Sequence, residues 1–204
     1  MNKMNKMNQG YLELIIGPMF SGKTSRLIEI YNQCIADNIN VIVVNFIGDK
    51  RYHKTMLSSH DEIVVPCEFT QSLRDFLDGD YMQNADVILI NEGQFFDDLY
   101  ESVRTMIDEL HKKVYVCGLD GDYRREKIGY ILDLIPICDK LEKLTSKCSV
   151  CNEVALFSHR TVKQREQYVI GANDSYMPLC RACYLQRNEK VAGIYYTEDS
   201  SKTI

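Results

Sequence analysis

The segment Gly17–Thr24 constrains this chain most, because it has the spacing G-x-x-x-x-G-K-T. It follows an apolar run, Leu12–Ile16, and precedes residues whose apolar positions have helical spacing. Strand, glycine-rich loop and helix are the context in which this motif binds the phosphates of a nucleoside triphosphate. Backbone N–H groups and the positive end of the helix dipole hold the phosphate oxygens. The alternative is a glycine turn that holds a lysine by chance, and the agreement of motif and context argues against it.

Two side chains of this loop have the chemistry that a triphosphate needs. Lys23 would reach the β- and γ-phosphates, and the hydroxyl of Thr24 would complete the shell of a bound Mg²⁺. The predicted phosphate-binding residues of the loop are Gly17, Pro18, Met19, Phe20, Ser21, Gly22, Lys23 and Thr24. The sequence therefore predicts that the chain binds a nucleoside triphosphate together with Mg²⁺.

Further apolar runs alternate with helical patterns along the chain. Strands are predicted at Val41–Val44, Glu62–Val65, Val87–Ile90 and Val114–Gly118. Apolar residues from Leu99 to Leu110 recur at helical spacing, and Pro136 interrupts any helix in the mixed stretch that follows. This alternation predicts a mostly parallel, three-layer α/β domain over residues 11–144.

Composition and charge narrow the partners. The chain has 24 Lys and Arg against 29 Asp and Glu, a formal net charge of −5, and no basic stripe, so we expect no nucleic-acid partner. No apolar run reaches the roughly 18 residues that span a bilayer, and the polar N-terminus lacks a signal-peptide core. We therefore expect a cytoplasmic protein without a membrane partner, with a disordered tail over residues 1–10 and a flexible tail over 193–204.

A candidate catalytic acid follows the strand Val87–Ile90. Phosphate-loop enzymes often have an aspartate at the end of a later buried strand, which holds the Mg²⁺ shell. Here that position is Asn91, which can accept a hydrogen bond from a metal-bound water but brings no charge, and Glu92 comes next. We predict that Glu92 takes the proton from an attacking hydroxyl or helps to order the metal. A solvated glutamate in a strand-end loop is the alternative.

Two cysteine pairs form the second strong pattern. Cys148 and Cys151 are separated from Cys180 and Cys183 by 28 residues, and each pair has zinc-knuckle spacing. Four thiolates suit tetrahedral Zn²⁺ and leave no open position for a reacting water, so we predict structural zinc in a domain over residues 145–192. A redox pair is the alternative, and two matched pairs argue against it.

The segment between the cysteine pairs must form a long loop or a hairpin. It contains Phe157, Ser158, Tyr168, Gly171 and Tyr176, and a long loop anchored by metal would serve as a lid over a small polar ligand. A hairpin that binds a partner is the alternative. The four histidines show no ligand spacing, and we predict no role for them.

The order of these motifs resembles the type II thymidine kinases, the cellular and poxvirus-like family with a zinc-bearing lobe. The motifs that carry the resemblance are Gly17–Thr24 with its internal Pro-Met-Phe, Asp49-x-Arg51, Glu92-Gly93-Gln94-Phe95-Phe96, Leu119-Asp120-Gly121 and Cys180-Arg181-x-Cys183-Tyr184. The resemblance extends from about Leu12 to Tyr184. It implies a RecA-like P-loop domain, a small zinc-binding domain with a lasso loop, and transfer of the γ-phosphoryl group of ATP to thymidine. It also implies a homotetramer and feedback inhibition by dTTP.

Residue roles follow from the same resemblance. It implies that Glu92 is the base for the 5′-hydroxyl, and that the phosphate side also includes Asp49, Lys50, Arg51, Asn91, Gly93 and Gln94. It implies that the thymidine side consists of Met19, Phe95, Leu119, Tyr123, Ser158, Gln167, Tyr168, Val169, Ile170, Gly171 and Tyr176. Gln167 to Gly171 would present backbone groups to the base, and Ser158 would lie near the thymine methyl.

The chain departs from the family pattern at a few positions. Asn91 replaces an aspartate, Tyr123 replaces a phenylalanine, and Ala172-Asn173 replaces a second glycine and its neighbour. Because Glu92 is kept, we expect activity, with weaker Mg²⁺ binding than an aspartate would give. Two other functions stay open: an NTP-dependent switch or nucleic-acid-handling ATPase with a zinc interaction module, and a catalytically inactive binding protein.

Overall fold

A computed structural model describes residues 9–48, 56–58, 63–77, 79–163, 166–168 and 175–188. Its centre is a six-stranded sheet with the order β5-β2-β6-β7-β1-β8, in which every neighbouring pair is parallel. The strands are β1 (Tyr11–Gly17), β2 (Val41–Phe46), β5 (Glu68–Thr70), β6 (Val87–Asn91), β7 (Lys113–Leu119) and β8 (Lys140–Lys143). The predicted mostly parallel α/β fold is confirmed, and so are the strands predicted at Val41–Val44, Val87–Ile90 and Val114–Gly118.

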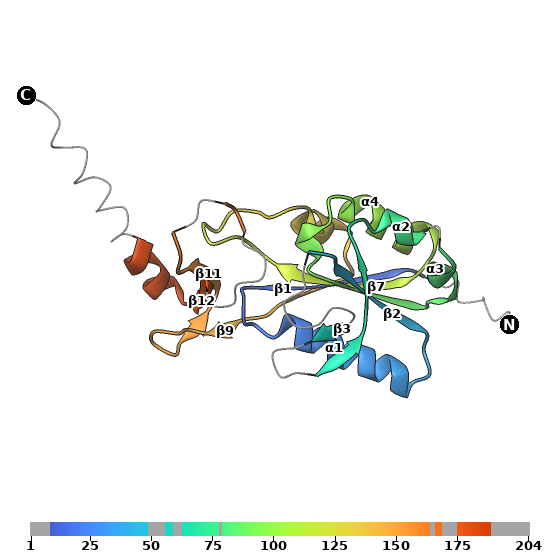
Figure 1. The fold of residues 1–204 in the computed structure, drawn as a ribbon, viewed down its shortest axis with the longest axis horizontal. Coiled ribbons are helices and arrows are strands. Elements are labelled where there is room, and N and C mark those ends of the chain that lie inside the picture. The colour runs from blue at the N-terminus through green and yellow to red at the C-terminus, as the bar shows by residue number, and fades with distance from the viewer. Residues whose placement is uncertain are drawn as a thin grey trace, which may run out of the picture.

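Both faces of the sheet are covered, which gives three layers (Figure 1). Helix α1 (Lys23–Ala36) lies on one face, and α2 (Arg74–Leu77) and α4 (Leu99–Arg104) lie on the other. Alternate side chains of one strand therefore enter different cores: Ile15 of β1 packs with the α1 side, while Leu14 and Ile16 pack with the α4 side. Burial on both faces explains why these strands are continuous apolar runs.

Three further elements complete this domain. A hairpin is formed by β3 (Met56–Ser58) and β4 (Val64–Pro66). β4 overlaps the strand predicted at Glu62–Val65 at Val64 and Val65, while Ile63 lies outside the strand and Glu62 outside the described ranges. Short helix α3 (Asp80–Asn84) precedes β6. In the part of the chain that the structure describes, no helix has both the length and the apolar character to cross a bilayer.

Two segments differ in detail from the sequence prediction. The helix predicted from Leu99 to Leu110 begins as α4 but continues as a π-helical segment, η2 (Thr105–Glu109). Pro136, predicted to interrupt any helix, lies inside a 3₁₀ segment, η3 (Ile131–Ile137). Strand β8 was not predicted because its residues, Lys-Leu-Glu-Lys, carry charges at an edge; Lys140 Nζ lies 2.8 Å from the buried Glu13 Oε1, which ties this edge to β1.

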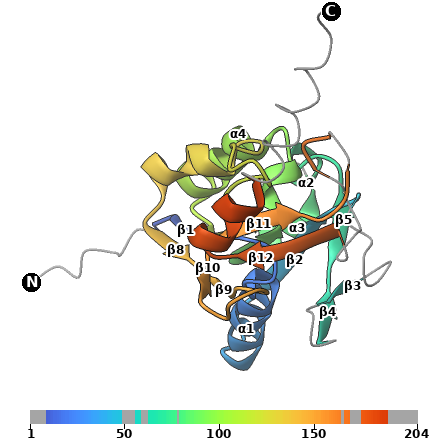
Figure 2. The ribbon, with the colours of Figure 1, turned by 90° about the vertical axis from the view of Figure 1, so that its left-hand side faces the viewer.

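A small module follows the sheet (Figures 1 and 2). It contains the antiparallel pairs β9 (Ser146–Lys147) with β10 (Val154–Ala155) and β11 (Phe157–Arg160) with β12 (Tyr176–Leu179), and residues 181–188 are helical. Its buried core is small and consists of Cys148, Ala155, Leu179, Cys180 and Tyr184. The module contacts the loop after β1, because the Ser146 hydroxyl donates to the Phe20 carbonyl at 2.8 Å. Of the segment between the cysteine pairs, for which a long loop or a hairpin was predicted, the described residues include the antiparallel pair β11–β12.

Candidate active site

The loop between β1 and α1 has the backbone of a phosphate cradle. Gly22 takes φ 81°, in the left-handed region that glycine adopts without strain, and α1 begins at the next residue. Lys23 is 9% exposed, and its Nζ donates to the Pro18 carbonyl at 2.7 Å and to Ser21 Oγ at 3.4 Å. The ammonium group is therefore held over the loop, where it could donate a charge-assisted hydrogen bond to a phosphate oxygen.

A neutral amide cluster replaces the usual acid at the end of β6. Asn91 Oδ1 accepts hydrogen bonds from Thr24 Oγ1 at 3.4 Å and from Cys117 Sγ at 3.0 Å, and its Nδ2 donates to Asn45 Oδ1 at 3.0 Å. Asn45 and Asn91 are each 2% exposed. The structure thus brings Thr24 and Asn91 together, as a Mg²⁺ site would need, but this pair contributes oxygen ligands without negative charge.

Glu92 has an unusual backbone conformation at the strand end. Its φ and ψ are 53° and 42°, a left-handed conformation that costs a non-glycine residue on the order of 1 kcal/mol or more. Its side chain is buried, and Oε2 accepts a hydrogen bond from Gln94 Nε2, while Gln94 Oε1 accepts one from the Leu119 N–H at 3.0 Å. A Cβ on Gly118 would lie 2.2 Å from Gln94 Oε1, so only glycine leaves room for this bridge. The carboxylate is therefore fixed beside the phosphate loop, since Leu119 pairs with Gly17.

The two phenylalanines after Glu92 have different environments. Phe96 is fully buried in the α4-side core, whereas Phe95, in the 3₁₀ turn η1 (Gly93–Phe95), is half-buried. The ring centroid of Phe95 lies 4.8 Å from that of Tyr168 and 5.6 Å from that of Phe46. Phe95 and Tyr168 thus form an aromatic wall at the carboxyl edge of the sheet.

The module closes the other side of this site. Ser158 is buried, and its Oγ accepts a hydrogen bond from the Met19 N–H at 2.9 Å, 139 residues away in sequence. Tyr123 is presented by a turn in which Asp122 Oδ1 accepts hydrogen bonds from the N–H groups of Arg124 and Glu126, each at 2.8 Å. The exposed Gln167 donates from Nε2 to the Lys127 carbonyl at 2.9 Å.

The structure covers most of the residues that the sequence singles out. It describes the phosphate loop and the predicted site residues Asn91, Glu92, Gly93, Gln94, Phe95, Leu119, Tyr123, Ser158, Gln167, Tyr168 and Tyr176. The others lie outside the described residues: Asp49, Lys50, Arg51, Val169, Ile170 and Gly171. Sequence reasoning missed Asn45, Cys117 and Arg160, which belong to no motif and are brought to the site only by the fold. The two-residue spacing of Ser158 and Arg160, which places both on one face if the segment is a strand, was the only local signal for Arg160.

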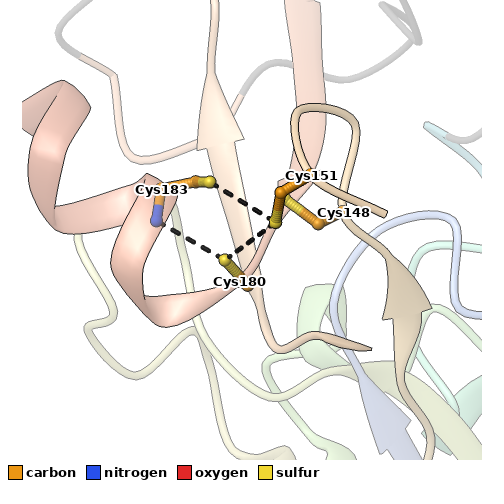
Figure 3. Close-up of side chains that lie close together, drawn as sticks. All are labelled: Cys148, Cys151, Cys180 and Cys183. Atoms are coloured by element: carbon orange, nitrogen blue, oxygen red, sulfur yellow. Dashed lines mark hydrogen bonds between the residues drawn. The ribbon is translucent and has the colours of Figure 1, made fainter. Parts of the chain in front are cut away.

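The four cysteines converge on one point (Figure 3). Cys148 and Cys151 lie on the turn between β9 and β10, and Cys180 and Cys183 lie at the start of the helical residues 181–188. Their sulfur atoms all lie within 4.8 Å of one another, with Cys151 Sγ 3.5 Å from Cys180 Sγ and 3.6 Å from Cys183 Sγ. Sulfurs around a tetrahedral Zn²⁺ lie about 3.8 Å apart, so the donor set fits a zinc ion.

The thiols of this cluster differ in acidity. Burial acts to raise the pKa of Cys148, but hydrogen bonds from the backbone of Cys180, Cys151 and Val150 outweigh it and lower that pKa to about 6. Hydrogen bonds with the sulfurs of Cys180 and Cys151 raise the pKa of Cys183 to about 12. One sulfur therefore carries charge readily while another retains its proton, and a divalent cation would displace that proton.

Fold and site together define a P-loop nucleotide-binding phosphotransferase with a cysteine metal module. The family model described as thymidine kinase matches residues 10–184. The chain therefore belongs to the thymidine kinase family, and the resemblance found in the sequence is confirmed.

Relatives come from plants and poxviruses. The chain is 38% identical over 206 residues to thymidine kinase a of Arabidopsis thaliana, covering 99% of this chain and 87% of that protein. It is 38% identical over 186 residues to the thymidine kinase of vaccinia virus (strain Western Reserve), covering 88% and 99%. Among solved structures, domain III of the Thermotoga maritima replication initiation protein DnaA has a TM-score of 0.42 at 16% identity, covering 68% of this chain and 56% of that one. So low a TM-score carries no functional argument.

Proposed function

We propose that this chain transfers the γ-phosphoryl group of ATP to the 5′-hydroxyl of thymidine, giving dTMP and ADP. The observation that carries the proposal is the buried Glu92 carboxylate, which the Gln94 amide holds beside the phosphate loop. In this reaction the 5′-oxygen forms a bond to the γ-phosphorus as the bond to the bridging oxygen of ADP breaks. The hydroxyl proton goes to Glu92.

Donor binding would use the loop Gly17–Thr24. Lys23 already lies over the loop and would exchange its contact with the Pro18 carbonyl for phosphate oxygens, with the backbone N–H groups completing the cradle. Asp49, Lys50, Arg51, Gly93 and Gln94 are proposed for the same side. Gln94 contacts Glu92 and Leu119, which supports a role in positioning the Glu92 carboxylate rather than in direct contact with phosphate.

The Thr24 hydroxyl would bind Mg²⁺, and Asn91 Oδ1 would accept a hydrogen bond from a metal-bound water. When bound, Mg²⁺ would neutralise charge on the transferred phosphoryl group. Because Asn91 is uncharged, the triphosphate and Glu92 would supply more of the charge that balances the cation.

Acceptor binding would use the aromatic wall and the module. The thymine base would be surrounded by the side chains of Met19, Phe95, Leu119, Tyr123, Tyr168 and Tyr176. The backbone of residues 167–171 would present hydrogen-bonding groups to the thymine base. Ser158 would lie near the thymine methyl while its oxygen holds the Met19 N–H. The four cysteines would hold a structural Zn²⁺ at the base of this module.

Three further expectations belong to this proposal through the family. They are a homotetramer, feedback inhibition by dTTP and a cytoplasmic location. Light scattering would test the first, since a mass other than four chains would reject the tetramer. Inhibition of turnover by added dTTP would test the second.

A coupled assay for ADP release tests the reaction. With ATP, Mg²⁺ and thymidine we expect ADP release that depends on thymidine; hydrolysis without thymidine would favour a switch or ATPase, and no release would favour an inactive binding protein. Glu92→Gln should lower kcat by about 10²–10⁴-fold with ATP binding kept. Glu101→Gln, on the exposed face of α4, is the matched control and should leave kcat unchanged. A Glu92→Gln enzyme with normal kcat would reject Glu92 as the base.

A further inference from the structure

The strand β11 presents two buried polar side chains to the nucleotide-binding domain. Ser158 is 4% exposed and Arg160 is 6% exposed, and the period of a strand places them on the same face. The opposite face packs on the helical residues 181–188, with the rings of Phe157 and His159 at 5.2 and 6.1 Å from that of Tyr184. Ser158 accepts a hydrogen bond from the Met19 N–H of the phosphate loop, whereas Arg160 contacts other segments.

Arg160 joins three segments of the chain. Its Nη1 donates to the Glu166 carbonyl, and its Nη2 donates to the Gln167 carbonyl at 3.1 Å and to Tyr176 Oη at 2.6 Å. Its guanidinium carbon lies 3.9 Å from the ring centroid of Tyr123 and 5.2 Å from that of Tyr176. A planar guanidinium suits this role because its donors form a rigid fork and its faces stack on aromatic rings.

These contacts fix backbone rather than side chains of the loop. Hydrogen bonds to the carbonyls of Glu166 and Gln167 set the path of the chain immediately before Tyr168. The Tyr168 ring contacts Phe95, three residues after Glu92, so a shift of the loop moves the aromatic wall. The Tyr123 ring, which Arg160 stacks on, belongs to the turn after β7 and so ties the loop to the sheet domain.

We infer that Arg160 is a positioning residue, which holds the loop at residues 166–168 against Tyr123 and so sets the shape of the acceptor pocket. The inference rests on the proposed function, in which thymidine binds against this loop. The contacts given above tie Arg160 to the loop, to Tyr176 and to Tyr123, all on the proposed acceptor side. We therefore expect its loss to weaken thymidine binding more than ATP binding.

Arg160→Lys tests this, because it keeps the charge and loses the fork. We expect KM for thymidine to rise about tenfold or more, with KM for ATP within about twofold and a smaller change in kcat. In thermal melts, ATP should still raise the midpoint of Arg160→Lys, while thymidine should no longer do so at concentrations that stabilise the wild type. Arg181→Lys is the matched control, since Arg181 is an exposed arginine of the same module that stacks on Phe157, and its kinetics should match the wild type.

A second variant keeps the test decisive where Arg160→Lys does not fold. Tyr176→Phe removes the hydroxyl that accepts from Nη2 and retains the ring, and we expect a rise of about two- to fivefold in KM for thymidine alone. An unchanged KM for thymidine in either folded variant, or equal rises in KM for thymidine and ATP, would overturn the inference. Failure of the wild type to phosphorylate thymidine would instead overturn the proposed function, so the two failures are distinguishable.

Discussion

The sheet domain and the cysteine-bearing module keep their shapes by different means. The larger core of the sheet domain contains seventeen buried residues on the α4 side alone, whereas the core of the module contains five, two of them cysteines. A core of five residues buries too little apolar surface to order a module by itself, so we expect polar contacts, and a metal ion at the four cysteines, to add to its stability. The phosphate loop lies mainly on the sheet domain, and the module adds to it the hydrogen bonds of Ser146 to the Phe20 carbonyl and of the Met19 N–H to Ser158. We infer that the proposed acceptor side depends more strongly on the polar contacts of the module.

Two neighbouring phenylalanines, Phe95 and Phe96, are expected to have different roles. Phe96→Ala should destabilise the sheet domain by about 3–5 kcal/mol, because it opens a cavity in a fully packed core. Phe95→Ala, the matched variant, should cost much less stability and should instead raise KM for thymidine, because Phe95 forms the aromatic wall. Chemical denaturation of both proteins checks this, and equal losses of unfolding free energy would contradict the difference in their roles.

Asn91→Asp sharpens the account of the phosphate side. The new carboxylate should lower the Mg²⁺ concentration for half-maximal rate by roughly three- to tenfold. The substitution also removes the Nδ2 donor of residue 91, so that two acceptor oxygens face each other in a buried pair with Asn45 Oδ1. We therefore expect the free energy of unfolding to fall by about 1–3 kcal/mol. Titration of the rate with Mg²⁺ measures the first effect. The control Asn84→Asp adds the same charge at an exposed position and should change neither the Mg²⁺ requirement nor the free energy of unfolding. An unchanged Mg²⁺ requirement in Asn91→Asp would show that position 91 contributes little to Mg²⁺ binding.

Acid should weaken the module before the sheet domain. In the metal-free chain the pKa of Cys148 is about 6, below its ordinary value of 9.0, so the contribution of this one thiol to stability is complete above pH 9 and is lost as the pH falls through 6. The pKa of Cys183 is raised instead, so the acid sensitivity of the loaded module comes mainly from the metal. Protonation also competes with zinc for the same sulfur. We expect the zinc retained after dialysis to fall as the buffer pH is lowered from neutrality, with the helical circular dichroism of the sheet domain little changed. Zinc retention that does not depend on pH would contradict this.

Some elements of both the sheet domain and the module can be predicted from the sequence. β2, β6 and β7 are continuous apolar runs because both their faces are buried, and the phosphate loop and the four cysteines have fixed spacings, so each was predicted. The edge strand β8 was missed because three of its four residues are charged, and it joins the sheet only by pairing with the distant strand β1, beside an ion pair between Lys140 and Glu13, 127 residues away. Arg160 and Asn45 were missed for the same physical reason: their roles come from contacts between distant segments, which leave no local spacing.

Binding of the two substrates to zinc-loaded and zinc-stripped protein tests the central claim most directly. Isothermal titration calorimetry should show that zinc removal changes the affinity for ATP with Mg²⁺ by less than about threefold, and weakens thymidine binding by more than about tenfold. Returning zinc should restore thymidine binding. Thymidine binding that survives zinc removal, or loss of both ligands together, would contradict the division between a phosphate site held mainly by the sheet domain and an acceptor site held mainly by the module.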